Sequence, residues 1–272
     1  MPVRVLLTND DGIAATGLHS LRKALLEVPG IELAVIAPDG NRSATARSIT
    51  TRRPLRVTKV EFDDGTHGFA CDGTPVDCVR LAKHGLVDGF QAEMVVSGVN
   101  HGSNLGDDVT YSGTVAAALE AIVLGIDGLA VSQQSAGGEY DFISHAGDEG
   151  FAAVATFAAG LVGRWAQIPL RPGTLVNING PAQLPKGVAI TRLGKRIYRE
   201  ELVDLGAADQ GGRHIRIYGQ EPSHHPEPGT DLQAVEDGFI AVTPVHYDLT
   251  DHLGLDQLER ADLAALVSSP LS

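Results

Sequence analysis

The residues best suited to chemistry in this sequence start with Asp10 and Asp11, two adjacent carboxylates followed by Gly12. Consecutive strand residues point to opposite faces, so these carboxylates converge only if a strand ends there. Gly12 permits that turn, although Asp-Gly is also a common turn pair without chemistry. Ser43 and Asn100 follow two other apolar runs and offer neutral oxygens. We therefore expect one divalent cation of the Mg2+, Mn2+ or Ca2+ type on these four residues, since zinc more usually recruits His or Cys.

A second group of residues predicts an anion site. Ser112, Gly113 and Thr114 open an alanine-rich stretch, where hydroxyls and free backbone N–H groups at a helix start bind phosphate. A plain helix cap is the alternative. Asn104 lies in a glycine-containing loop nearby and is expected to contact the same phosphate. The chain contains neither a dinucleotide fingerprint nor an ATP-binding phosphate loop.

Asp248 and His252 lie four residues apart near the end of the chain. Imidazole is well matched to donate a proton to a leaving group near neutral pH, and a carboxylate one helical turn earlier would orient the ring. We therefore name Asp10, Asp248 and His252 as candidate catalytic residues. The alternative is that Asp248 caps a short helix and His252 lies on its surface.

The segments that position these residues alternate between short apolar runs and longer amphipathic stretches. Apolar runs without two-residue alternation favour a parallel sheet covered on both faces, a doubly wound α/β fold. Ligands of such folds bind beyond the carboxyl ends of the strands, where the polar loops fall in this sequence. The expected strands are 3–8, 31–37, 68–71, 94–97, 129–132 and 175–178, and the expected helices are 17–28, 74–86, 114–124 and 151–165.

The pattern changes beyond residue 185. Segments 188–192 and 214–218 are expected to be strands, paired as arms with little core of their own. We accordingly divide the chain into a metal- and phosphate-binding domain, 1–185, and an oligomerisation segment, 186–272, that contributes to the active site. The pair His224 and His225 precedes a proline and is interpreted as loop rather than as a metal site.

Composition excludes several functions. A net charge of −13 argues against a nucleic acid polymer as partner, because such binding needs a basic surface. The stretch 41–56 holds five arginines and no acid, which predicts either a phosphate-attracting patch or a solvated loop. The first apolar run is too short for a signal peptide and no later one would cross a membrane, so we expect a cytoplasmic protein without membrane contact. Cys71 and Cys78 match neither zinc nor redox spacing and are expected to be reduced packing residues.

Taken together, the motifs resemble the SurE family of survival proteins, which are metal-dependent nucleotidases. The resemblance extends over nearly the whole chain. It rests on Thr8-Asn-Asp-Asp-Gly12, Ala37-Pro-Asp-Gly-Asn-Arg-Ser43, Gly73-Thr-Pro-Val-Asp-Cys-Val79, Ser97-Gly-Val-Asn-His-Gly-Ser-Asn104, Tyr111-Ser-Gly-Thr114, Gly229-Thr-Asp231 and Thr243-Pro-Val-His-Tyr-Asp-Leu-Thr-Asp-His252.

This resemblance implies a Rossmann-like domain and hydrolysis of nucleoside 5'-monophosphates, with side activity on 3'-monophosphates and short polyphosphate. It also implies metal ligands at Asp10, Asp11, Ser43 and Asn100, and dimers or tetramers that exchange C-terminal arms. Segment 210–220 departs from the aromatic-rich pattern of the family, which puts the arm geometry in doubt.

Other functions are compatible with the same loops. An aspartate-nucleophile phosphatase requires Asp-x-Asp, and Asn9 occupies the first position here. A zinc deacetylase would need a His ligand that this loop lacks. A non-catalytic nucleotide sensor would use the binding loops without turnover.

Overall fold

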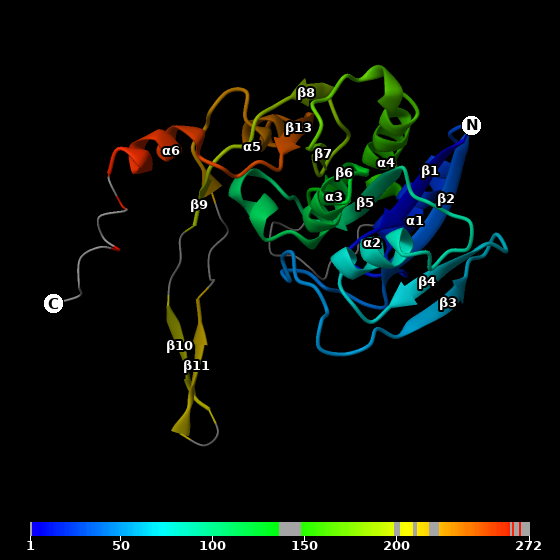
Figure 1. The fold of residues 1–272 in the computed structure, drawn as a ribbon, viewed down its shortest axis with the longest axis horizontal. Helices are drawn as coiled ribbons and strands as arrows, with labels where there is room; N and C mark the ends of the chain where they lie inside the picture. The colour runs from blue at the N-terminus through cyan, green and yellow to red at the C-terminus, as the bar shows by residue number, and fades with distance from the viewer. Residues whose placement is uncertain are drawn as a thin grey trace.

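The structure is a computed structural model that describes residues 2–135, 148–198, 202–208, 211–217, 223–261, 263 and 267. Within these residues, nine strands form one twisted sheet in the order β3-β4-β2-β1-β5-β6-β7-β13-β8 (Figure 1). The strands are β1 Val3–Thr8, β2 Ile31–Pro38, β3 Val57–Glu61, β4 His67–Cys71, β5 Met94–His101, β6 Asp127–Gln133, β7 Thr174–Gly180, β8 Val188–Ile190 and β13 Ile240–His246.

The central strands are parallel, as predicted. β1 pairs in parallel with β2 and β5, and β6 pairs in parallel with β5 and β7. The carboxyl ends of these strands therefore meet at one edge of the sheet. The strands β3 and β13 run antiparallel to β4 and β7, so the sheet is mixed toward its two margins.

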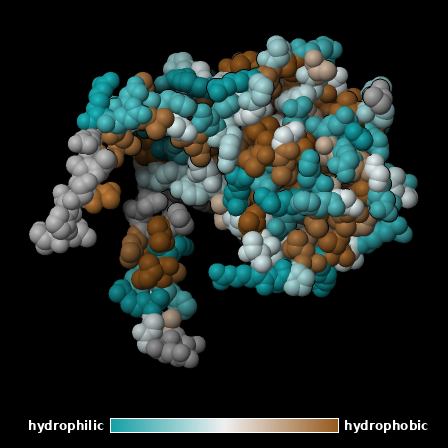
Figure 2. Space-filling view, viewed as in Figure 1, coloured by the Kyte–Doolittle hydropathy of each residue, from teal (hydrophilic) through white to brown (hydrophobic). Residues whose placement is uncertain are grey.

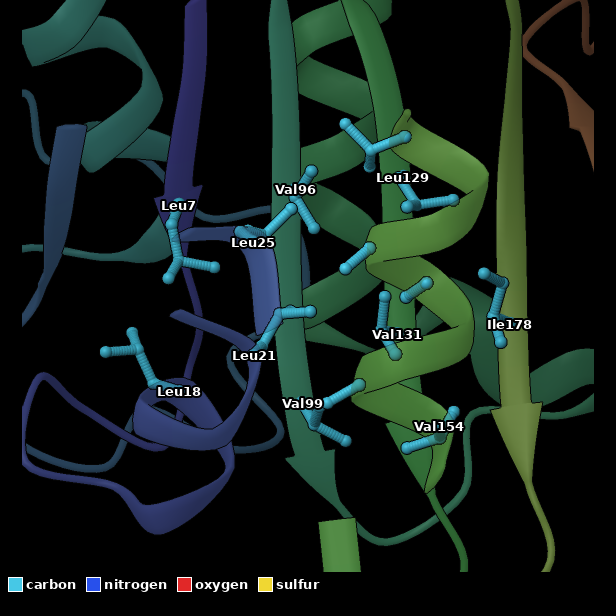
Figure 3. Close-up of a cluster of buried hydrophobic side chains, with 14 of the residues drawn as sticks. Leu7, Leu18, Leu21, Leu25, Val96, Val99, Leu129, Val131, Val154 and Ile178 are labelled. Carbon is cyan, nitrogen blue, oxygen red and sulfur yellow. The ribbon is translucent and has the colours of Figure 1, made fainter. Parts of the chain in front are cut away.

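Helices cover both faces of the sheet, which explains why its strands are apolar throughout. One face packs α1 Thr16–Leu26 and α4 Asp148–Val162, and Figure 3 shows Leu25 of α1 lying beside Val96 of β5. The other face packs α2 Pro75–Lys83 and α3 Gly113–Val123. The doubly wound α/β fold is confirmed, because a helix layer buries each face.

Cys71, at the end of β4, and Cys78, on α2, belong to the same buried core and are free thiols. Their role in packing is confirmed. None of the helices among the described residues is long and apolar enough to cross a membrane.

The C-terminal part of the chain differs from the predicted pair of arms. β8 pairs in parallel with β13, which itself pairs with β7, so both strands belong to the main sheet. The prediction that 188–192 pairs with 214–218 was therefore wrong, and Tyr218 at the end of that segment lies outside the described residues. Ile240, Ala241 and Val242 are buried, and this apolar run finds its core against the sheet rather than in an arm.

Short elements connect the sheet to a projecting hairpin. β10 Val203–Ala207 pairs with β11 Arg213–Arg216, and the hairpin extends away from the sheet in Figure 1. At its base, β9 Arg196–Ile197 pairs with β12 Ser223–His224, where the sequence predicted a loop. The helices α5 Asp231–Glu236 and α6 His252–Glu259 complete this part, with the 3-10 segments η1 Gly106–Thr110 and η2 Trp165–Gln167 elsewhere.

Apolar side chains are exposed on both C-terminal projections. The hairpin shows a hydrophobic surface in Figure 2, to which Leu205 and Ile215 contribute exposed fractions of 57% and 42%. On α6, Leu253 and Leu258 are also exposed.

Candidate active site

The acidic loop begins where β1 ends, at Thr8. The side chain of Asn9 closes the turn, because its Oδ1 accepts the Gly12 N–H at 3.1 Å and its Nδ2 donates to the Gly12 carbonyl at 2.9 Å. Gly12 has φ +108°, and a Cβ there would lie 3.0 Å from the backbone of Gly40. The turn that Asp10 and Asp11 need is thus set by Asn9 and Gly12.

Asp10 is buried against the start of α3. Its Oδ1 accepts a hydrogen bond from the Thr114 hydroxyl at 2.5 Å. A Cβ on Gly113 would lie 2.8 Å from Asp10 Oδ2, so only glycine permits this approach. The structure therefore brings Asp10 into contact with Gly113 and Thr114, which lie more than a hundred residues later in the sequence.

Asp11 is held by backbone and amide donors. Its Oδ2 accepts the His101 N–H at 3.0 Å, and its Oδ1 accepts from Asn41 Nδ2 at 3.4 Å. His101 ends β5, a strand that runs four residues beyond the predicted end at residue 97. The strand register shifts between Ser97 and Asn100, which allows this extension to reach the acidic loop.

Burial sets the electrostatics of the pair. Desolvation, followed by the negative charge of Asp11, raises the pKa of Asp10 from 3.8 to about 7, against the opposing hydrogen bond from Thr114. Desolvation also raises the pKa of Asp11. The hydrogen-bond donors named above are all neutral, so they do not compensate two adjacent negative charges. A bound divalent cation would do so, and these oxygen donors fit one.

Ser43 and Asn100 lie in segments fixed to this loop. The Arg42 N–H donates to the Asp10 carbonyl at 2.7 Å, which joins the Ser43 loop to the acidic loop. The Ser43 N–H donates to Asn41 Oδ1 at 2.8 Å. Asn100 uses its Nδ2 for the Gly102 carbonyl at 2.8 Å, so Oδ1 is the atom of its amide that suits a cation.

The predicted phosphate site divides into two parts. The Ser112 Oγ accepts the Val115 N–H at 3.1 Å, so this hydroxyl caps α3 as the alternative interpretation held. Gly113 and Thr114 remain in the first turn of a helix of eleven residues, directly beside Asp10. Backbone N–H groups in the first turn of a helix lack intrahelical acceptors, so those of Gly113 and Thr114 are suited to an anion, and their contact with phosphate stays a prediction.

Asn104 lies in a buried network of amides instead of an open loop. Its Nδ2 donates to Ser132 Oγ at 2.8 Å, and its carbonyl accepts from Asn177 and Asn179. These hydrogen bonds fix the loop after β5 onto β6 and β7. They give Asn104 a structural use, and its contact with phosphate stays a prediction.

The arginine-rich stretch is anchored to the protein by ion pairs. Arg42 and Arg56 pair with Asp39, and Arg53 pairs with Asp72. Arg47 reaches across to Glu120 on α3 at 2.7 Å. These pairs anchor the stretch, but Arg42 and Arg56 share Asp39 and Glu120 also pairs with Arg80, so the stretch keeps part of its positive charge.

Asp248 and His252 contact each other, with His252 Nε2 2.9 Å from Asp248 Oδ2. This hydrogen bond, followed by the Thr250 N–H, holds the pKa of Asp248 well below its usual range. The cap of α6 is Asp251, which accepts the Leu253 N–H, so the alternative cap role for Asp248 was wrong. The histidine side chain is 71% exposed, at the start of a helix that lies at the margin of the molecule in Figure 1.

Comparison with known proteins adds to this geometry. The family described as "Survival protein SurE" matches residues 5–200. This chain belongs to the SurE family. The "5'-nucleotidase SurE" of Rubrobacter xylanophilus is 50% identical over 270 residues, covering 97% of this chain and 99% of the relative. That of Chloroflexus aggregans is 44% identical over 260 residues, covering 94% and 98%.

A solved SurE structure shares the fold. The protein from Aquifex aeolicus has a TM-score of 0.78 and 34% sequence identity to this chain, over 95% of this chain and 99% of that one. The nine-stranded sheet and its C-terminal strand β13 are thus those of a SurE protein. The Rossmann-like expectation from the sequence is confirmed.

Sequence reasoning missed two residues that shape this SurE site. Asn9 closes the acidic turn, and the signal in the sequence was the tendency of asparagine to form local turns, directly before Asp10. His101 supplies a backbone N–H to Asp11, which no side-chain pattern reveals. Among the described residues, no cluster of three or more His, Cys, Asp or Glu side chains is placed to hold a metal ion. The candidate donor set is therefore carboxylate with neutral oxygen.

Proposed function

We propose that this protein is a divalent-metal-dependent 5'-nucleotidase that hydrolyses nucleoside 5'-monophosphates to nucleoside and phosphate. Relatives that match this chain over nearly their whole length are named 5'-nucleotidases. The observation that carries the proposal is the contact between the buried carboxylate of Asp10 and the start of α3. That contact supports a cation site directly beside a phosphate site.

Asp10, Asp11, Ser43 and Asn100 would hold one cation of the Mg2+, Mn2+ or Ca2+ type. When bound, it would supply Lewis-acid polarisation of the phosphate and activation of a water molecule. Asp10 and Asp11 must be ionised to bind the cation. Burial raises the pKa values of both carboxyl groups, and a bound cation would lower them. Thr114 fixes the rotamer of Asp10 by donating to one oxygen of its carboxylate.

The phosphate is bound by the backbone N–H groups of Gly113 and Thr114, at the positive end of the α3 dipole. The absence of a side chain on Gly113 lets the phosphate and Asp10 share this space. Ser112 fixes the first turn of the helix by capping it. Asn104 completes the site through the loop that it anchors, with direct contact to phosphate proposed as well.

His252 would protonate the leaving oxygen of the nucleoside. Asp248 orients the ring through its hydrogen bond to Nε2. A selective loss in the His252→Ala variant tests this role: nucleoside monophosphates, whose leaving group is poor, should lose far more activity than an aryl phosphate. Equal losses would leave His252 as a positioning residue.

Activity on 3'-monophosphates and on short polyphosphate is part of the proposal, because the site recognises phosphate and metal rather than a base. We further propose a cytoplasmic homodimer or homotetramer with exchanged C-terminal arms. The exposed apolar side chains of the hairpin and of α6 support that assembly.

One rival function fits the geometry less well. A covalent aspartyl intermediate would need a nucleophile at position 9, where Asn9 is buried and uses its side chain to close the turn. A nucleotide sensor that binds a metal–nucleotide complex would use the same carboxylates, so turnover is the property that separates it from a nucleotidase.

Release of inorganic phosphate from adenosine 5'-monophosphate, measured with Mn2+, Mg2+ or excess chelator, tests the proposal. We expect turnover with the metal ions and none with chelator. Nucleotide binding without phosphate release under any metal would establish the sensor instead.

A further inference from the structure

Arg47 contacts two parts of the protein that are distant in sequence from its own loop, Glu120 on α3 and Tyr247 after β13. It lies in the Arg loop, residues 39–56 between β2 and β3, which also carries the candidate metal ligand Ser43. The other ion pairs of this loop join it to Asp39 and Asp72, at the ends of β2 and β4. Arg47 instead joins the loop to α3 and to the segment that follows β13.

The contact with α3 is made to a desolvated carboxylate. Glu120 is 1% exposed, and its two oxygens face Arg47 Nη2 and Arg80 Nη2, each at 2.7 Å. A buried carboxylate of this kind requires its cations, so the geometry of Arg47 is tightly constrained. Glu120 lies six residues after Thr114, or about 9 Å along the helix axis. The helix α3, whose first turn contacts Asp10, thus also holds Arg47 through Glu120.

The second contact of Arg47 is with Tyr247. Arg47 Nη1 donates to Tyr247 Oη at 3.3 Å, and the guanidinium lies over the ring at 5.4 Å from its centroid. Tyr247 directly precedes Asp248, the partner of His252. One side chain therefore links the Ser43 loop, the helix at the phosphate site and the segment that holds the candidate general acid.

The backbone of the Arg loop needs such a constraint. Ala44 and Ala46, on the Ser43 side of Arg47, have φ of +57° and +50°. This left-handed conformation is unfavourable for residues with a Cβ, so external contacts must maintain it. Removing the Arg47 contacts should release this part of the loop first.

We propose that Arg47 is a positioning residue of the phosphatase site, which holds Ser43 and the Asp248–His252 pair in one arrangement around the phosphate. This inference rests on the proposed function. Arg47 acts through these residues and does not itself touch the substrate. A simple stabilising ion pair is the competing interpretation.

Arg47→Met keeps the length of the side chain and removes its charge, and Arg53→Met is the matched control because it removes another ion pair of the same loop. Hydrogen exchange measured by mass spectrometry should accelerate in two peptides of Arg47→Met, 39–50 and 245–252. In Arg53→Met, peptide 245–252 should keep the wild-type rate. This measurement needs no catalysis.

Kinetics then test the consequence for the reaction. Arg47→Met should lower kcat on a nucleoside 5'-monophosphate by at least about tenfold, as misplaced catalytic groups do, with a smaller loss on an aryl phosphate. Arg47→Lys should recover part of the rate, because lysine keeps a positive charge beside Glu120 but lacks the planar guanidinium that contacts Tyr247. Arg53→Met should stay within about twofold of the wild type, as expected for an exposed ion pair.

Unchanged exchange in 245–252, equal effects of the Arg47 and Arg53 variants, or wild-type kinetics in Arg47→Met would each overturn the inference. A wild-type protein that releases no phosphate from any nucleoside monophosphate would refute the proposed function instead. The exchange measurement would still decide whether Arg47 holds both segments.

Discussion

At the scale of single residues, the protein keeps two carboxylates where burial opposes their charge. Asp10 is 4% exposed and adjacent to Asp11, and the pKa values of both are raised. A fold optimised for stability alone would avoid this pair. Such destabilised groups are typical of functional sites, where binding of a ligand compensates the cost.

Asp10→Asn and Asp11→Asn should each remove most phosphatase activity while leaving a folded protein. Each variant deletes the negative charge of one proposed ligand without changing its size. Turnover at saturating Mn2+, together with circular dichroism, checks this. Near wild-type rates in either variant would refute the assignment of that residue as a ligand.

The raised pKa of Asp10 gives the metal-free protein a specific pH dependence. The folded state binds this proton more tightly than the unfolded chain, so stability should fall as pH rises from about 4 to about 7 and then level off. Three pKa units correspond to roughly 4 kcal/mol.

In the absence of metal, the Asp10→Asn variant should therefore be more stable than the wild type at pH 8, by up to that amount. The advantage should shrink toward pH 5. Urea unfolding in chelator at both pH values measures it. A variant less stable than the wild type at pH 8 would contradict the burial argument.

Thr114→Val should weaken transition-state binding by roughly 1 to 3 kcal/mol, the range for a hydrogen bond to a charged group. Thr114 donates to Asp10, so part of the loss should be seen as weaker Mn2+ binding. Thr114→Ser keeps the hydroxyl and serves as the control. An unchanged kcat/KM in Thr114→Val would leave Thr114 as a structural residue.

At the scale of elements, α2 connects the hydrophobic core to the Arg loop, residues 39–56. Thr74 and Asp77 form a capping box at its start, with Pro75 in the first turn. The Asp77 carboxylate also accepts from the Thr50 N–H and hydroxyl, at 3.0 and 2.7 Å. A helix cap thus also anchors the Arg loop.

Asp77→Ala should lower the free energy of unfolding by about 2 to 4 kcal/mol, because it removes a cap and leaves buried donors without partners. Thr50→Val removes only the hydroxyl contact and should cost about 1 kcal/mol. Urea denaturation of both variants measures the difference. Equal costs would indicate that the cap contributes nothing beyond the loop anchor.

At the scale of the whole molecule, the sheet core carries two projections whose apolar side chains remain exposed. The hairpin β10–β11 and the helix α6 both extend from the sheet in Figure 1. Arg196, at the base of the hairpin, is buried and paired with Asp108, so the projection starts from a fixed point. This arrangement suits a rigid arm that docks on another copy.

Replacing residues 202–217 by a short glycine-serine linker should yield smaller particles than the full-length protein by light scattering. This deletion spares β9 and also Gly194, whose N–H donates to Asp231 Oδ1 at 2.8 Å. The double variant with Leu205→Ser and Ile215→Ser is a milder change, and it should also reduce the particle size. A monomeric wild type at micromolar concentration would exclude arm exchange.

The sequence by itself determined the fold class and the position of the carboxylate pair at a strand end. Apolar runs that lack alternation require a sheet buried on both faces, and Asp10 with Asp11 before Gly12 requires a turn at a strand end. Both follow from local covalent geometry and periodicity. The bounds of β1, β2 and β4 could be predicted within a residue for the same reason.

Only the tertiary structure decided which side chains meet. β13 joins the main sheet because Ile240 to Val242 find apolar neighbours there, which no local pattern specifies. The contact of Asp10 with Thr114 and that of Arg47 with Glu120 join residues 104 and 73 positions apart. Burial arises from such contacts, and burial sets the pKa of Asp10. The sequence names the acids, but their unusual energetics come from the packing of α3 against the end of β1.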